Sequence, residues 1–388
     1  MKILYMTISY TPEANGLYQN LVDSLNRRNH EITIVRSQYD IENTIYEDIS
    51  DQLHILTVKT GNPFENNLVK KGMNQILLAP YFKNAIKKYL SHDKYDLILY
   101  ATPPITLANV VKFCKKRYNA KTFLMLKDIF PQNAVDLGMM REKSIIYRYF
   151  KHQESLYYTY SDYIGCMSQG NKEYLLKHNP EISNEKVGIF PNSITVDETD
   201  GTIFNKHKTV IMFGGSLGKP QNIKGLLCII EKLKEYDKAE FVIIGSGTEQ
   251  KRILEFVEKY DGHNFVYKNF MPQKEYEKIL CNADVGLISL DPRFTIPNIP
   301  SRFQTYLKLK KPVLAITDVN TDIKDMIIVN ECGWWCDATN IDSVIDTIKE
   351  ICENKERQIL KGENGRRYLE KEFDVEQNVD ILEKFIGE

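Results

Sequence analysis

The chain has 388 residues, 43% of them hydrophobic and 27% charged, which is enough for two globular domains and excludes a disordered or fibrous protein. Its 51 basic and 52 acidic residues leave a formal net charge of −1, so no global field attracts it to nucleic acid or to an anionic membrane. The seven scattered cysteines are odd in number, which favours a reducing compartment over a disulfide framework.

The ends and the cysteine spacing indicate where the protein works and what it lacks. The chain opens on a strand-like segment with no basic leader, and no apolar run approaches the roughly 18 residues that span a bilayer, so we expect a cytoplasmic protein. Cys332 and Cys336 form the one close pair, and no histidine or second pair completes a zinc site. The cysteine spacing therefore predicts no zinc site, and we expect no other metal and no cofactor.

Strands alternate with helices through the first 190 residues. The pattern predicts a strand over 2–8, a loop over 9–16 and a helix from Leu17. It then predicts strands over 31–36, 96–100 and 121–126 and a helix over 105–117. Most residues of a tyrosine-rich run over 147–163 fit one long helix, and despite its cations the run matches no nucleic-acid-binding module. Such alternation predicts a parallel sheet covered by helices on both faces.

A second series starts at Thr209. It predicts strands over 210–213, 240–244, 265–267 and 285–290, which alternate with helices over 222–236, 249–260 and 275–280. The polar segment 191–208 reads as a linker, so the expected domains are 1–190 and 209–370. The pattern over 362–387 predicts two helices with much apolar surface, which requires a packing partner. One interpretation is that residues 371–388 cross back and pack on the first domain.

Two glycine turns follow strands of the second series. Gly214-Gly215-Ser216 precedes Lys219 and Lys224, and freed amides, ammonium groups and a helix start together suit a diphosphate. Gly245-Ser246-Gly247 ends the next strand at the same expected sheet edge, where ligands of open α/β sheets bind. A tight turn with solvated lysines is the alternative.

Polar residues also end strands of the first domain. Asn15 and Gly16 lie at a helix start, and Asp128 follows an apolar strand, where a carboxylate can bind hydroxyls or accept a proton. A plain turn and ordinary helix capping are the respective alternatives. The segment 67–90 interleaves apolar residues with lysines, which fits either an anionic membrane surface or a core-packed helix with a solvated face.

The order and spacing of these segments over nearly the whole chain resemble the family-four retaining glycosyltransferases of the GT-B fold, especially the bacterial branch that builds capsule and O-antigen polysaccharides. The resemblance lies in Pro12-Glu13, residues 127–138, Phe190-Pro-Asn-Ser193, the Gly214 and Gly245 turns, residues 299–306, Lys311-Pro-Val313 and Cys332-Gly-Trp334. It implies two Rossmann-like domains with parallel sheets facing a cleft.

The resemblance also implies roles. A nucleotide-diphosphate sugar, with a UDP-sugar favoured, would bind the second domain, and a polyprenyl-diphosphate-linked or saccharide acceptor the first. The donor residues implied are Gly16, Gly214, Gly215, Ser216, Lys219, Lys224, Gly245, Ser246, Gly247, Ser301, Arg302 and Thr305. Asn15 and Asp128 would meet the acceptor, Asp128 as a positioning carboxylate, and Lys219 would stabilise the leaving diphosphate. Membrane docking through 67–90 fits a lipid-linked acceptor.

The chain departs from the family at one motif. Two glutamates usual there are replaced by Pro297 and Thr305, so one sugar contact must be made otherwise or lost. Two alternatives to a glycosyltransferase follow. One is a non-catalytic nucleotide-sugar-binding subunit that works with a second glycosyltransferase chain, and the other is a nucleotide-sugar epimerase of the same fold.

Overall fold

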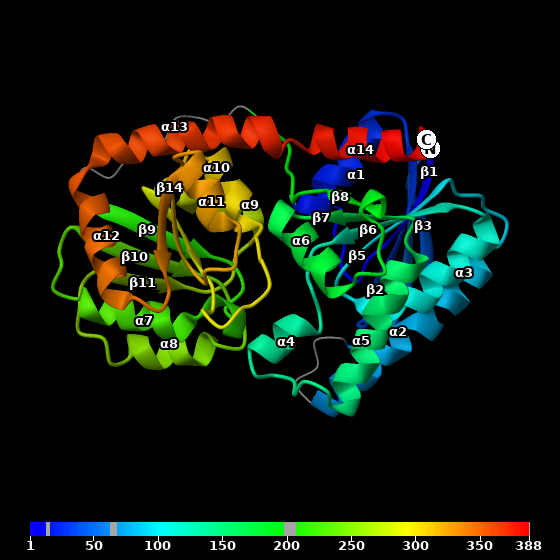
Figure 1. The fold of residues 1–388 in the computed structure, drawn as a ribbon, viewed down its shortest axis with the longest axis horizontal. Helices are drawn as coiled ribbons and strands as arrows, with labels where there is room; N and C mark the ends of the chain where they lie inside the picture. Colours follow the sequence, from blue (N-terminus) through cyan, green and yellow to red (C-terminus); the bar gives the residue numbers. More distant parts are fainter. Residues whose placement is uncertain (13–15, 63–67, 198–206, 388) are drawn as a thin grey trace. The chain divides into compact units, whose positions relative to one another are not determined.

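The computed structural model describes residues 1–12, 16–62, 68–197 and 207–387, which form two compact units. Unit 1 comprises Met1–Asn192 and Val375–Glu388, and unit 2 comprises Ser193–Asp374. Of the expected linker over 191–208, residues 198–206 lie outside the described residues, and Ser193–Asp197 belong to unit 2. Each unit is built on its own sheet (Figure 1).

Unit 1 has an eight-stranded sheet in the order β3-β4-β2-β1-β5-β6-β7-β8. All neighbouring strands are parallel except β3 and β4, which form an antiparallel pair at one edge. The elements of unit 1 are β1 (Lys2–Met6), α1 (Leu17–Arg27), β2 (Glu31–Gln38), β3 (Ile45–Ser50), β4 (Leu53–Lys59), α2 (Leu68–Tyr89), β5 (Leu97–Ala101), the 3₁₀ turn η1 (Ile105–Leu107), α3 (Ala108–Tyr118), β6 (Lys121–Leu126), α4 (Gln132–Asp136), α5 (Ile145–Tyr160), β7 (Tyr163–Cys166), α6 (Gln169–His178), η2 (Asn184–Lys186), β8 (Val187–Ile189) and α14 (Val375–Gly387).

Unit 2 has a six-stranded parallel sheet in the order β11-β10-β9-β12-β13-β14. Its elements are β9 (Thr209–Gly214), η3 (Lys219–Gln221), α7 (Ile223–Lys232), β10 (Ala239–Ile244), α8 (Gln250–Val257), β11 (Phe265–Lys268), α9 (Gln273–Leu280), β12 (Val285–Ser289), α10 (Arg302–Lys308), β13 (Val313–Thr317), α11 (Ile323–Val329), β14 (Gly333–Asp337), α12 (Ile341–Glu353) and α13 (Lys355–Glu372). The chain moves outward in one direction from β9 to β11 and in the other from β12 to β14, as in the doubly wound nucleotide-binding fold.

The helices form where apolar residues recur at helical spacing, and they bury those residues on the sheets. In unit 1, α1 buries Leu21, Val22 and Leu25 against β1 and β2, and α14 adds Val379 and Leu382 to the same core. In unit 2, α7, α8 and α12 close over the strands in the same way. Both predicted parallel sheets and the return of the last helix to the amino-terminal unit are therefore confirmed.

Some sequence-based expectations were wrong in detail. The first strand ends at Met6 rather than Ile8. Most of the tyrosine-rich run forms one helix, α5, as expected, and Tyr163 lies on β7. The segment expected as one helix over 105–117 begins as the 3₁₀ turn η1. No helix within the described ranges is both long and apolar enough to cross a bilayer.

Candidate functional site

A cavity of about 250 Å³ opens at the carboxyl ends of the strands of unit 2. Its lining comes from the last residues of β9 and β10 and from the segments that follow β9, β10, β11 and β12, namely Gly214, Gly215, Ser216, Ile244, Gly245, Phe270, Met271, Gln273, Tyr276, Ser301, Arg302 and Thr305. The strand order reverses between β9 and β12, and ligands of open α/β sheets bind in the crevice at such a reversal. Topology and cavity thus indicate the same place.

The floor of this cavity is made of two glycine turns in backbone contact. The amide of Gly215 donates to the carbonyl of Ile244 at 2.9 Å, and the amide of Leu217 donates to that of Ser246 at 2.9 Å. Gly215 and Gly245 have φ of +127° and +155°, and a Cβ on Gly245 would stand 1.9 Å from the carbonyl oxygen of Gly215. Only glycine allows the two turns to approach this closely.

Arg302, the first residue of α10, brings a cation to the cavity. Its guanidinium carbon lies 4.3 Å from the centroid of the Phe213 ring, and one of its nitrogens is 3.3 Å from where a Cβ on Gly215 would stand. Burial lowers the pKa of Arg302, whose Nη1 is buried without a hydrogen-bond partner. None of the ion pairs in the described part of the chain includes Arg302, so its charge is available to an anion.

Two tyrosines fix the helices around Arg302. The hydroxyl of Tyr306 donates to the carbonyl of Met212 or Leu287, at 3.2 and 3.1 Å, which attaches α10 to the neighbouring strands β9 and β12. The ring of Tyr276, on α9, covers Gly214 so closely that a Cβ there would lie 2.2 Å from it. Glycine at 214 and tyrosine at 306 are therefore needed to hold the wall of the cavity.

Residues 197–368 match the family model described as Glycosyl transferases group 1. The second unit is a group 1 glycosyltransferase domain. A probable glycosyltransferase of Pseudomonas aeruginosa, WbjE, is similar to the chain, with 27% identity over 303 residues that cover 74% of each protein. The chain is thus a glycosyltransferase that transfers a sugar from a nucleotide sugar.

Solved structures share the fold of both units at low sequence identity. Sucrose-phosphate synthase from Thermosynechococcus elongatus matches with a TM-score of 0.79 at 13% identity, over 99% of this chain and 98% of that one. HepE of Anabaena, in complex with UDP and glucose, matches with a TM-score of 0.70 at 13% identity over 100% of both chains. The predicted GT-B fold, with two Rossmann-like domains, is therefore confirmed.

The group 1 glycosyltransferase domain brings together seven of the twelve residues expected at the donor. Those that line its cavity are Gly214, Gly215, Ser216, Gly245, Ser301, Arg302 and Thr305. Ser246 and Gly247 belong to the same turn but do not line it. At the departure from the family motif, Pro297 is buried, whereas Thr305 reaches the cavity.

Lys219 and Lys224 are exposed and do not line the cavity. Lys219 begins η3, which follows the glycine turn, and Lys224 lies in the first turn of α7. The side chain of Asn222 accepts a hydrogen bond from the amide of Gly225 at 3.3 Å, so the amino end of α7 is capped from within. In the described structure the cation that lines the cavity is Arg302.

Sequence reasoning missed Ile244, Phe270, Met271, Gln273 and Tyr276. Four of these residues follow the short strand β11 at the same sheet edge as the two glycine turns. That position was the available signal, because the carboxyl ends of parallel strands share one edge. Phe270 is largely exposed and gives the cavity an aromatic side.

In unit 1, Asp128 follows β6 at the carboxyl edge of the sheet. Asn133 Nδ2 lies 2.8 Å from both of its carboxylate oxygens, and burial raises the pKa of Asp128 to about 6. Asp128 does not cap α4, which has no side-chain cap bond, so the capping alternative is wrong. The accessible surface of Asp128 is intermediate, so its carboxylate remains within reach of a ligand.

Lys127 ties the end of β6 to the segment that leaves β8. Its ammonium group donates to the carbonyls of Phe190 and Pro191, both at 3.1 Å, and burial lowers its pKa to about 7. Gly16 precedes α1, and its carbonyl accepts from the side-chain and backbone nitrogens of Asn20 at 2.6 and 2.9 Å. Asn15, expected at the acceptor, lies outside the described residues.

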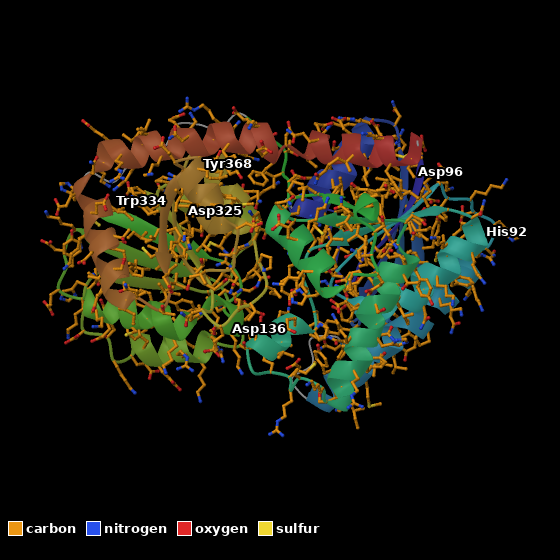
Figure 2. The ribbon with its side chains drawn as sticks, viewed as in Figure 1. His92, Asp96, Asp136, Asp325, Trp334 and Tyr368 are labelled. Carbon is orange, nitrogen blue, oxygen red and sulfur yellow. The ribbon has the colours of Figure 1, made fainter. Side chains whose placement is uncertain are left out.

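Other features carry no comparable arrangement. A second cavity lies at the amino ends of β5 and β6, lined by His92 and Asp96 among others (Figure 2). This is the edge away from ligand sites in such sheets, and Asp96 already accepts from the amide of Lys2 at 2.7 Å. Trp334, on β14, does not line the donor cavity. Among described residues, no three His, Cys, Asp or Glu side chains are grouped to hold a metal ion.

Proposed function

We propose that the chain is a retaining glycosyltransferase that moves a sugar from a UDP-sugar to a hydroxyl of a lipid-linked or saccharide acceptor, in the assembly of a capsule or O-antigen polysaccharide. The pathway and acceptor rest on the family resemblance of the sequence. The preference for uracil is supported by the likeness to HepE, which was solved in complex with UDP and glucose.

The observation that carries the proposal is the guanidinium of Arg302, which lines the cavity next to the glycine turn and whose Nη1 is buried without a hydrogen-bond partner. Breaking the bond between the anomeric carbon and the diphosphate leaves extra negative charge on the departing nucleotide. Arg302 can meet that charge with parallel N–H donors, next to the turn of Gly215 and Ser216. Because its charge is not already neutralised by a carboxylate, Arg302 would stabilise the leaving diphosphate, with Lys219 and Lys224 adding charge from the exposed side of the loop.

The proposed chemistry needs no carboxylate nucleophile. The acceptor oxygen bonds to the anomeric carbon on the face that the diphosphate leaves, and the departing phosphate oxygen takes the hydroxyl proton. Thr305 would bind the ribose, and Ser301 would contribute a second hydroxyl at the donor. Asp128 would orient the acceptor hydroxyl through its carboxylate, which is the role its position after β6 suits.

The test compares the removal of the arginine that lines the cavity, Arg302, with the removal of an exposed arginine that does not line it, Arg367. Arg302→Ala should lower kcat/KM for sugar transfer by about 100-fold or more, the usual loss for a donor to developing negative charge, and weaken UDP binding. Arg367→Ala, a change at an exposed position of α13, is the matched control and should leave both unchanged. Transfer is assayed with a panel of UDP- and GDP-sugars and a lipid-linked acceptor, and affinity by calorimetry.

Three results would count against the proposal. Unchanged UDP affinity and transfer in Arg302→Ala would remove its central residue. A large loss in Lys219→Ala alone would return the leaving-group role to that exposed lysine. Tight UDP binding with transfer appearing only after a second protein is added would indicate the partner-subunit alternative instead.

A further inference from the structure

The segment between α4 and α5 presents large apolar side chains to solvent. Ile145 and Ile146, which begin α5, are 85% and 61% exposed, and Met139 is also exposed. Single exposed apolar residues are common on soluble proteins, but two adjacent isoleucines with most of their surface in water are not explained by packing. We call residues 139–148 the tip segment.

Cations surround these side chains. Arg141, Lys143 and Arg148 are exposed, and none of them appears in an ion pair with any residue that the structure describes. Glu142 is the one acid within the tip segment. Its charge pattern therefore suits an anionic partner.

The amino-terminal half of α2 projects at the same edge of the sheet. Both α2 and α5 pack on α3, because Lys83 and Lys87 of α2 lie over the ring of Phe113 and Lys115 of α3 donates to the carbonyl of Tyr160 at 3.4 Å. The three helices run in the same direction. At 1.5 Å per residue, the 22 residues of α2 and the 16 residues of α5 make these helices about 16 Å and about 8 Å longer than α3, which has 11 residues. In Figure 1 the starts of α2 and α5 lie at the lower edge of this unit, beyond the start of α3.

This projecting half of α2 has the same character as the tip segment. Met73, Ile76 and Leu77 are exposed, and every charged residue of α2 is a lysine. Because α3 separates α2 from α5, and packed helix axes lie about 8 to 10 Å apart, the two projections are within about 20 Å of each other. Two apolar and basic projections thus share one edge of unit 1.

We propose that the tip segment, together with Met73, Ile76 and Leu77, docks on the surface of an anionic lipid bilayer. A bilayer fits better than a flat protein face, because adjacent residues of a helix point about 100° apart and only a surrounding medium can bury both Ile145 and Ile146. The unpaired cations would meet the lipid phosphates while the isoleucines enter the acyl boundary.

Docking of the tip segment would also bring a lipid-linked acceptor close to Asp128. This consequence rests on the proposed function, whereas the docking itself does not. Phe130 follows Asp128 by two residues, and its ring packs edge-on against Phe150 of α5, with centroids 5.0 Å apart. Phe150 lies one helical turn from Ile146. A lipid-linked acceptor held in the bilayer would therefore present its headgroup near the carboxylate that is proposed to orient it.

The experiment measures binding of the full chain to vesicles without any sugar donor. Cosedimentation with phosphatidylcholine vesicles is compared with cosedimentation with vesicles that also contain phosphatidylglycerol. We expect binding to the anionic vesicles only, weakened by salt, and a fall of about tenfold or more in the partition coefficient of Ile145→Glu/Ile146→Glu. The matched control is Ile328→Glu/Val329→Glu on α11, an equally exposed pair in unit 2 at 55% and 77%, which should bind like the parent.

Transfer to a water-soluble saccharide acceptor, measured without vesicles, separates this inference from the proposed function, and Ile145→Glu/Ile146→Glu should retain it. Equal binding of the two double variants, or no binding to anionic vesicles, would overturn the inference. So would self-association in sedimentation velocity that Ile145→Glu/Ile146→Glu abolishes without any vesicle binding, since the surface would then be a contact between copies.

Discussion

At the scale of single residues, the donor cavity depends on backbone that has no room for a side chain. A Cβ at position 245 would stand 1.9 Å from the carbonyl oxygen of Gly215, and residue 245 has a φ that side-chain-bearing residues rarely adopt. Real Cβ atoms do not approach backbone so closely, so any larger residue must push the two turns apart.

Gly245→Ala should therefore weaken UDP binding by about tenfold or more and lower the free energy of unfolding by about 2 kcal/mol. Gly72→Ala is the matched control, because a Cβ there meets nothing within 4 Å and the residue sits inside α2. Calorimetry with UDP and chemical denaturation measure the two effects. Similar behaviour of both variants would show that the turns are not held as described.

The carboxyl group of Asp128 gives a prediction about pH. Burial raises its pKa to about 6, so the group is largely ionised at pH 7 and becomes protonated as the pH falls through 6. If the carboxylate orients the acceptor hydroxyl, kcat/KM for the acceptor should fall about tenfold per pH unit below 6. Asp128→Asn should be slower and should lose this acidic limb, while UDP affinity stays unchanged. A limb of the same shape in Asp128→Asn would exclude the role.

At the scale of elements, α14 is held to α1 by packing and by charge. Arg28 donates to Glu376 and Glu383 at 3.0 and 2.9 Å, while Val379 and Leu382 are fully buried in the core of unit 1. Partly exposed ion pairs contribute at most about 1 kcal/mol each, whereas a buried leucine contributes several times more. Packing should therefore dominate.

Leu382→Ala should lower the free energy of unfolding by about 2 to 4 kcal/mol, and Arg28→Ala by about 1 kcal/mol. Chemical denaturation of the two variants decides between them, and salt should reduce only the contribution of Arg28. A larger loss in Arg28→Ala would mean that the charges, not the apolar face, hold the last helix.

Elements with regular apolar spacing were the part of the fold that the sequence could predict. Alternating strands and helices indicated both parallel sheets, and the apolar face of the last helix required a partner, which unit 1 supplies. The antiparallel strand β3 is mostly exposed, so its sequence lacks the buried pattern that marks the other strands. Such an edge strand follows from pairing with β4 rather than from local composition.

The site was predictable to the extent that it depends on local sequence. Glycines after two strands indicated the two turns, whereas the cation that lines the cavity did not follow from its distance to them along the chain. Arg302 is placed by the packing of α10, which Tyr306 attaches to the carbonyls of two strands, and by the ring of Phe213. These contacts join residues far apart in sequence, whereas spacing along the chain favours Lys219.

At the scale of the whole molecule, the chain leaves unit 1 after Asn192, forms all of unit 2, and returns to unit 1 at Val375. The core of unit 1 includes Val375, Val379 and Leu382. During synthesis on the ribosome, all of unit 2 is translated before α14, which completes the core of unit 1. The apolar surface of unit 1 that α14 covers therefore stays exposed until residues 375–388 have been synthesised, and in this interval the chain is most open to chaperones and to aggregation.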